Sequence, residues 1–298
     1  MRIVLFGDGA WAAETLRTLR VDGHHIAAVV GRRKPTDGAL ESEARRWGLE
    51  YASPDRVNAY PFVELVRRWV PELNLSFSYD QIIRHPLLGA APLGFLNCHA
   101  GMLPRYRGRN VVNWALANGE REIGLTIHYL DEGIDTGDLL VQEALSIAWE
   151  DDYGSLLRKI RKAFPGLVRR ALTAIDHATA VRRPQPHEGE YWRRRGPGDE
   201  DIDWTRPSVE VYNLIRAVSR PGPGARTWDG RGRERIVWRA AYELGWPRVR
   251  ARPGVVLPGE GGSIRVATAD STILLQEVRD PEGRPVPMRA GERLEGRP

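Results

Sequence analysis

The sequence predicts an α/β fold, with a mostly parallel sheet and crossover helices in the first half and a small β-barrel in the last third. In the first half, short apolar runs of the buried-strand type alternate with segments whose apolar residues recur at helical spacing. In the last third, short strand-like runs are separated by Gly and Pro turns. A chain of 298 residues is long enough for one large core and one smaller core.

The expected elements of the first half follow one another in a regular order. Buried strands are predicted at 2–6 (RIVLF), 26–30 (IAAVV) and 73–77 (LNLSF), with helices at 11–19, 41–47 and 63–70. Residues 95–112 (FLNCHAGMLPRYRGRNVV) predict another buried strand that runs into a loop rich in Gly, Pro and Arg. Two further strands at 123–130 and 139–145 precede a long amphipathic helix at 155–178.

Composition places the domain boundary near residue 180. Residues 1–180 form the predicted catalytic domain, and 181–205, with its prolines and charge blocks of both signs, form a linker. Residues 206–298 form the predicted barrel domain, which starts with a helix at 208–218. Strands are expected at 226–230, 235–241, 254–257, 262–270 and 271–278, and the last ten residues are expected to form a frayed tail.

Charge and cysteine content favour an ordinary cytoplasmic protein. The net charge is +5, from 44 basic and 39 acidic residues. No apolar run approaches the roughly 18 residues that a membrane helix needs, so no membrane partner is expected. A single cysteine excludes a disulfide framework and fits a reducing compartment.

The N-terminal GDGAWA motif, with Gly7, Gly9 and Ala12, stands where a dinucleotide-binding fingerprint would stand. The acidic residue expected about 20 residues further on is missing, because that position reads VVGRRK. Arg32 and Arg33 would suit a 2′-phosphate. The interpretation we favour is a tight strand-to-helix turn.

Three reactive side chains stand together at the end of the strand in 95–112. Because side chains alternate along a strand, Asn97 and His99 share one face and Cys98 points into the core. An Asn amide can donate to a developing oxyanion, and a His can move a proton. This pair therefore suits acyl transfer, although a lone N-x-H is also common as a satisfied core pair.

The segment DEGIDTGDLL (131–140) offers a carboxylate to orient the imidazole. It holds four acids between two apolar strands: Asp131, Glu132, Asp135 and Asp138. Acidic residues are also common in such turns for local hydrogen bonding. Spacing alone does not decide which acid faces His99, and we interpret His128, on the preceding strand, as structural.

Two longer motifs carry a resemblance to a known family. LNCHAGMLPRYRGRNVVNWALANGE, followed by HYLDEGIDTGDLL, resembles the 10-formyltetrahydrofolate-dependent formyltransferases. PDRVNAY, SFSYDQII, DIDWTRPSVEVYNLIRAVSRPGPGARTW and RIVWRA look like the members that carry a C-terminal barrel. The resemblance implies a Rossmann-like formyltransferase domain followed by an OB-like barrel, and an N-formyltransferase with 10-formyltetrahydrofolate as co-substrate and no metal.

The resemblance also implies site residues. Asn97, His99 and Asp135 match the catalytic trio of the family. Arg109 should lie beside the folate or its formyl-bearing arm. The positions that match its pterin site, held largely through backbone, are Gln81, Ile82, Ile83, Asp131, Glu132, Gly133, Ile134 and Asp135. The sequence departs from the family at 100–102, where Ala-Gly-Met replaces the more common Gly-Ser-Leu before LP.

The acceptor amine is the harder question. Members that act on tRNA carry a long basic insertion after the second strand, whereas here the segment is only GRRKPTDGALESEARRWG, with Arg32, Arg33 and Lys34 ahead of the expected helix. We therefore expect a small amine, most naturally on a nucleotide-linked amino sugar, with nucleic acid not a partner. The alternatives are a methionyl-tRNA formyltransferase, a 10-formyltetrahydrofolate hydrolase and a barrel-led nucleic-acid-binding protein. The sequence leaves a homodimer open.

Overall fold

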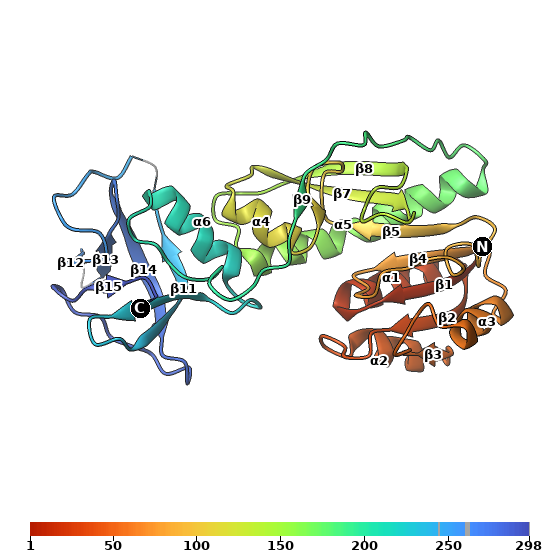
Figure 1. Ribbon diagram of the computed structural model, residues 1–298, viewed down its shortest axis with the longest axis horizontal. Helices are drawn as coiled ribbons and strands as arrows, with labels where there is room; N and C mark the ends of the chain where they lie inside the picture. The colour runs from red at the N-terminus through yellow and green to blue at the C-terminus, as the bar shows by residue number, and fades with distance from the viewer. Residues whose placement is uncertain (244, 260–262, 298) are drawn as a thin grey trace. The chain divides into compact units, whose positions relative to one another are not determined.

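The computed structural model describes residues 1–243, 245–259 and 263–297 and divides the chain into two compact units (Figure 1). Unit 1 comprises 1–108, 123–145 and 158–192, and unit 2 comprises 109–122, 146–157 and 193–298. Both units are therefore assembled from several stretches of chain. The boundary near residue 180 stays a prediction.

Unit 1 is built on a seven-stranded sheet of order β3-β2-β1-β4-β5-β7-β8. The strands are β1 (Arg2–Gly7), β2 (His25–Gly31), β3 (Tyr51–Ala52), β4 (Leu73–Phe77), β5 (Phe95–His99), β7 (Glu122–Tyr129) and β8 (Leu139–Ser146). The pairs from β3 to β5 are parallel, as the alternating pattern predicts. β7 runs antiparallel to β5, so the sheet is mixed rather than wholly parallel.

The predicted helices of the first half are confirmed, with ends that differ by a few residues. They are α1 (Gly9–Val21), α2 (Ala39–Arg46), α3 (Tyr60–Arg68) and α5 (Tyr153–Asp176). Phe77 of β4 meets Phe164 of α5 edge to face, with ring centroids 4.9 Å apart, so α5 packs against the centre of the sheet. The sequence did not predict the short elements β3, α4 (Val111–Ala117), β6 (Arg107–Gly108) and β9 (Tyr191–Trp192).

The turn from β1 to α1 shows why the GDG motif is present. A Cβ on Gly7 would lie 2.8 Å from the Ala12 Cβ and 2.9 Å from the Phe77 carbonyl oxygen, so only glycine lets helix and sheet approach this closely. Asp8 is buried beside it, accepts a hydrogen bond from the Thr36 amide and pairs with Arg32 at 3.2 Å. These contacts support the interpretation as a tight turn.

Unit 2 carries an antiparallel, barrel-like sheet of order β12-β13-β14-β11-β10-β15. The strands are β10 (Ala225–Asp229), β11 (Glu234–Ala241), β12 (Val256–Pro258), β13 (Ile264–Ala267), β14 (Thr272–Arg279) and β15 (Leu294–Glu295), and α6 (Ser208–Val218) matches its predicted bounds. Gly262, where one predicted strand starts, lies outside the described residues.

The expectation of a frayed tail is wrong. β15 pairs with β10, and the Leu294 side chain is 1% exposed. The Leu294 amide also donates to the Gly254 carbonyl at 2.8 Å. One buried leucine and a two-residue ladder therefore anchor the C-terminal segment, a signal too short for periodicity to detect. None of the helices in the described part of the chain is long and apolar enough to span a membrane.

Candidate active site

The end of β5 separates its side chains in the way that strand alternation predicts. Asn97 and His99 both approach Asp135, whereas Cys98 between them is 7% exposed. Burial raises the pKa of the Cys98 thiol well above its usual value, so the thiolate is disfavoured at neutral pH. Cys98 is therefore a small buried hydrophobe on the opposite face of the strand from the polar cluster.

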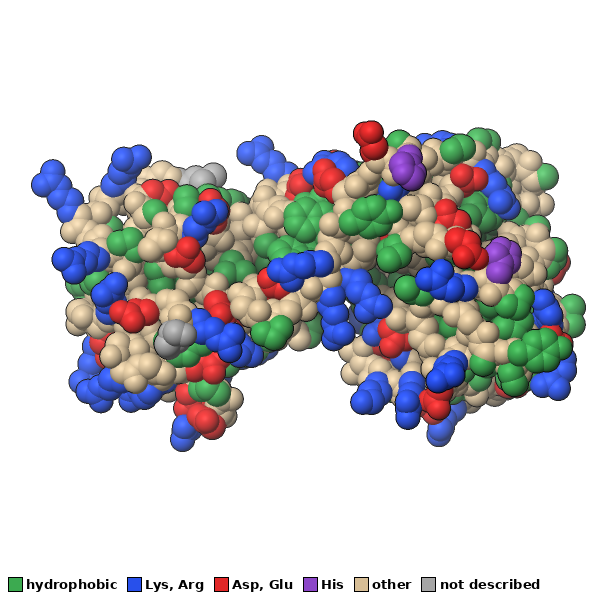
Figure 2. All heavy atoms as spheres, viewed as in Figure 1, with side chains coloured by type: hydrophobic (Ala, Val, Ile, Leu, Met, Phe, Trp, Pro, Cys, Tyr) green, Lys and Arg blue, Asp and Glu red, His purple; other side chains and the backbone are tan. Residues whose placement is uncertain are grey.

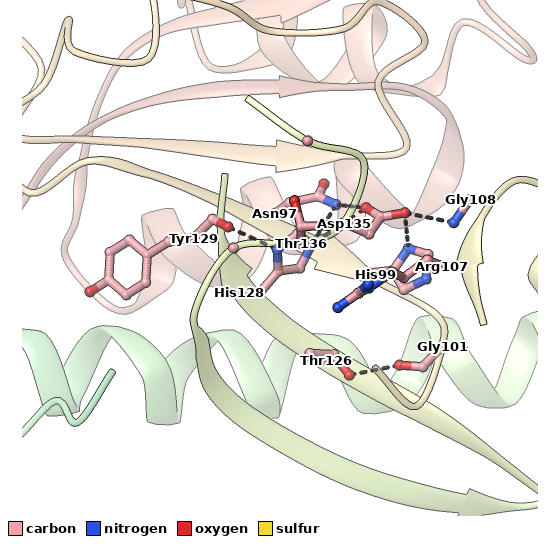
Figure 3. Close-up of polar contacts among 12 residues, drawn as sticks. Asn97, His99, Gly101, Arg107, Gly108, Thr126, His128, Tyr129, Asp135 and Thr136 are labelled. Atoms are coloured by element: carbon pink, nitrogen blue, oxygen red, sulfur yellow. Dashed lines mark hydrogen bonds and ion pairs between the residues drawn. The ribbon is translucent and has the colours of Figure 1, made fainter. Parts of the chain in front are cut away.

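The Asp135 carboxylate lies between two groups of donors (Figure 3). Its Oδ1 is 3.5 Å from Asn97 Nδ2, and its Oδ2 is 3.6 Å from His99 Nδ1. The Gly108 amide donates to Oδ2 at 2.9 Å. His99 Nε2 is 2.6 Å from the Tyr106 carbonyl oxygen, and because a carbonyl can only accept, this nitrogen carries the proton. The nitrogen that faces Asp135 is therefore Nδ1.

His128 is a fourth member of the cluster. The sequence interpretation treated it as structural and did not place it in the site. It is fully buried, and its Nε2 lies 3.5 Å from Asp135 Oδ1 and 3.2 Å from Asn97 Nδ2. Its Nδ1 donates to the Tyr129 carbonyl at 2.9 Å, so in the neutral ring Nε2 is free to accept from the Asn97 amide. No local pattern marks this role, because only the pairing of β7 with β5 places His128 opposite Asn97.

The loop after β7 brings Asp135, rather than the other three acids, to the histidines. Asp131 turns back on its own loop and accepts from the Gly133 amide at 3.0 Å and the Thr136 hydroxyl at 2.6 Å. Asp135 has a φ of 55°, a left-handed conformation that is uncommon outside glycine. The strained backbone position of this turn is thus the residue whose carboxylate enters the cluster.

The electrostatics of the cluster keep Asp135 ionised. Burial alone would raise the pKa of its carboxyl. The neighbouring His99 and His128 rings and the Gly108 amide outweigh burial and hold that pKa well below its usual range. At neutral pH the site therefore contains one carboxylate, two imidazoles and one amide within contact of one another.

The two segments expected to hold the pterin adjoin each other. Arg84 pairs with Glu132 at 3.7 Å, and the His85 amide lies 3.4 Å from the Glu132 carboxylate. Ile82 and Ile134, one from each segment, are 46% and 51% exposed, which is unusual for large aliphatic side chains. A flat heterocycle with hydrogen-bonding groups along its edges fits such a pair of segments, since exposed aliphatics can cover its faces and loop backbone can meet its edges.

The remaining expected contacts lie as follows. Ile83 is buried, and the Gln81 side chain is occupied by the Val57 amide at 2.9 Å and the Pro54 carbonyl at 3.0 Å, so both could meet a ligand chiefly through backbone. Arg109 is exposed and directly follows Gly108 in the chain.

Cys98→Ala offers a direct test of which side chains on β5 perform chemistry. We expect kcat to stay within about threefold of the unmodified enzyme, because burial and orientation keep the thiol out of the polar cluster, while Tm falls slightly from the lost packing. Steady-state kinetics and thermal unfolding on the same preparation would measure both. A loss of kcat as large as that of a His99 variant, in a folded protein, would contradict the orientation argument.

Family models and relatives match this chain over most of its length. The family model described as formyl transferase matches residues 1–172, and the model of its C-terminal domain matches 196–293. The methionyl-tRNA formyltransferase of Pelotomaculum thermopropionicum is 32% identical over 100% of this chain and 96% of its own length. That of Symbiobacterium thermophilum is 33% identical over 95% and 89%.

Among solved structures, WlaRD shares the fold. It is described as a sugar 3N-formyl transferase in the presence of dTDP and 5-N-formyl-THF. It superposes with a TM-score of 0.68 at 19% identity, over 93% of this chain and 97% of its own.

Proposed function

Because the chain belongs to the formyltransferase family, whose co-substrate is 10-formyltetrahydrofolate, we propose that it transfers the formyl group to a small primary amine, with an amino sugar linked to a nucleotide as the favoured class. The single observation that carries the chemistry is the convergence of Asn97, His99 and His128 on one ionised, largely buried carboxylate, that of Asp135. The exposed Ile82 and Ile134 would contact the folate ring.

Each member of the cluster has a role that its contacts suit. The co-substrate supplies a formyl carbon that an amine can attack. Asn97 Nδ2 donates toward the negative charge that develops on the formyl oxygen, a contribution of about 3–4 kcal/mol for one well-placed donor. His99, with its Nδ1 toward Asp135, receives or holds the proton that the amine must lose.

Asp135 stays ionised, so its carboxylate faces His99 Nδ1 as a negative charge. His128 accepts from the Asn97 amide and so orients it. Proton transfer and oxyanion stabilisation are thereby assigned to two side chains of β5, and His128 on the neighbouring strand β7 orients one of them.

The small acceptor is supported by the segment after β2. A protein that grips tRNA needs clustered, available cations. Here Arg32 pairs with Asp8 at 3.2 Å, and Arg33 pairs with Asp55 at 2.9 Å. Basic side chains are also scattered among acidic ones over the visible surface (Figure 2). Two of the three cations at residues 32–34 thus pair with acidic side chains of the protein.

Methionyl-tRNA is the second candidate acceptor, and it is favoured by the names of the relatives that are 32% and 33% identical over nearly the whole chain.

The deciding experiment measures acceptor-dependent release of tetrahydrofolate. Nucleotide-linked amino sugars, charged methionyl-tRNA, free amino acids and an acceptor-free control would be compared at low and moderate salt. For tRNA held through six phosphates, affinity should fall about 10³-fold between roughly 50 and 200 mM salt, whereas a nucleotide sugar should be nearly indifferent. We expect turnover with a small amine and little dependence on salt.

A matched variant sharpens the comparison. Lys34→Gln removes an exposed cation from the segment after β2 and should leave small-amine transfer unchanged. Efficient, salt-sensitive formylation of methionyl-tRNA that weakens in this variant would overturn the small-amine proposal. Equal release without any acceptor would indicate a hydrolase instead.

A further inference from the structure

The segment Arg183–Trp192, which we call the connecting segment, is bonded along its length to the loops that carry the active site. At its start, Arg183 and Leu139 exchange two backbone hydrogen bonds, at 2.8 and 3.0 Å. At its end, β9 pairs with β6, and the Trp192 ring stacks on Tyr106 with centroids 5.3 Å apart. The backbone of this segment forms part of unit 1.

Gln185 is the residue of this segment that reaches the catalytic loop. Its Nε2 donates to the Asp135 carbonyl at 3.0 Å and to the Gly137 carbonyl at 2.6 Å. Its Oε1 accepts from Arg107 Nη2 at 3.0 Å. One side chain thus ties the left-handed backbone at Asp135 to the loop before α4.

Arg107 holds Gln185 in this orientation. Its guanidinium is fully buried and also donates to the Pro186 carbonyl at 3.0 Å and the His187 carbonyl at 3.3 Å. A Cβ on Gly189 would lie 2.5 Å from Arg107 Nη1, so the segment closes over the guanidinium only with glycine there. The acceptors that the segment offers are uncharged, and they fix the position of Arg107 by several simultaneous hydrogen bonds.

The carboxylate and the backbone of Asp135 are therefore held from two directions. The Gly108 amide, next to Arg107 in the chain, fixes the carboxylate at 2.9 Å, and Gln185 fixes the carbonyl of the same residue. Asp135 adopts its disfavoured conformation, with φ of 55°, only where its surroundings impose it. Displacing a catalytic group by about 1 Å can cost 10²-fold in rate.

We propose that Gln185 is a positioning residue for formyl transfer: held by Arg107, it keeps Asp135 in the left-handed conformation that places its carboxylate between Asn97 and His99. This inference rests on the proposed function only for its kinetic test. It assigns a role in catalysis to the segment that joins the two units along the chain.

The test is Gln185→Glu, which keeps the size of the side chain and an acceptor for Arg107 but removes the amide that donates to Asp135 and Gly137. We expect kcat to fall at least tenfold, while KM for 10-formyltetrahydrofolate and Tm change little. Glu188→Gln is the matched control, because Glu188 is exposed on the same segment. If Gln185→Glu does not fold, Gln185→Asn, one methylene shorter, withdraws the same amide without adding charge.

A double-mutant cycle separates positioning from a merely structural role. If Gln185 acts through Asp135, adding Gln185→Glu to Asp135→Asn should cost no further kcat, since the carboxylate it places is already gone. Additive losses, or a Gln185→Glu enzyme with unchanged kcat, would overturn the proposal.

A second measurement needs no acceptor. Amide hydrogen exchange at 135–137 should be faster in Gln185→Glu than in the control. Unchanged exchange at 135–137 would contradict the proposal even if no acceptor supports turnover. Faster exchange in a protein without transferase activity would contradict only the proposed function.

Discussion

Asn97→Ala and His99→Asn are each expected to lower kcat by about 10²- to 10³-fold, the cost of removing one oxyanion donor or one acid–base group. Asn97 Nδ2 and His99 Nδ1 both lie within 3.6 Å of the Asp135 carboxylate, so each variant removes one arm of the cluster. Asp135→Asn should behave similarly. It removes the negative charge that faces the His99 ring and keeps the volume of the side chain. Single-turnover kinetics would isolate the chemical step.

Affinity for the folate should change much less in these three variants. The segments that we propose for the pterin, 81–83 and 131–135, contribute mainly backbone and the exposed Ile82 and Ile134. Cys98→Ala, on the opposite face of the same strand, is the matched control. Calorimetric titration that showed lost folate binding together with nearly normal turnover would refute the assigned roles.

Gly108→Ala is expected to damage both stability and catalysis. Gly108 has a φ of 99°, and a Cβ there would lie 2.3 Å from the Trp192 carbonyl oxygen, a clash with backbone that no side-chain rotation relieves. Strain and overpacking together should cost about 2 kcal/mol or more. Its amide also donates to Asp135, and loss of a hydrogen bond to a charged group should lower kcat by roughly 10- to 100-fold.

Gly23→Ala is the control for backbone strain alone, without the clash with Trp192 or the loss of the hydrogen bond to Asp135. Gly23 has a similar φ of 83°, and a Cβ there would meet nothing within 4 Å. Chemical denaturation and kcat should be measured for both variants. If Gly108→Ala matched Gly23→Ala in stability and kept full kcat, then neither the contact with β9 nor the amide bond to Asp135 would matter for function.

Local periodicity was sufficient for the long strands and helices and for part of the site. The period of two along 95–99 places Asn97 and His99 on one face, because successive side chains of a strand point to opposite sides. The same reasoning, applied to apolar runs and helical spacing, predicted the long strands and helices of both units. The family resemblance, which rests on two contiguous motifs, is likewise a property of the sequence alone, and the matching family models confirm it.

Tertiary structure decided what depends on residues far apart in the chain. Four acids in one loop have similar local patterns, and only the fold of that loop brings Asp135 to His99, 36 positions earlier. His128 joins the cluster because β7 pairs antiparallel with β5, which no local pattern predicts. Gln185 and Leu294 lie in segments too short or too polar to show periodicity, yet each is fixed by partners distant in sequence. Periodicity reports which face of an element is buried. The pairing of loops and sheet edges depends on hydrogen bonds between residues far apart in the chain, and these produce no repeating pattern in the sequence.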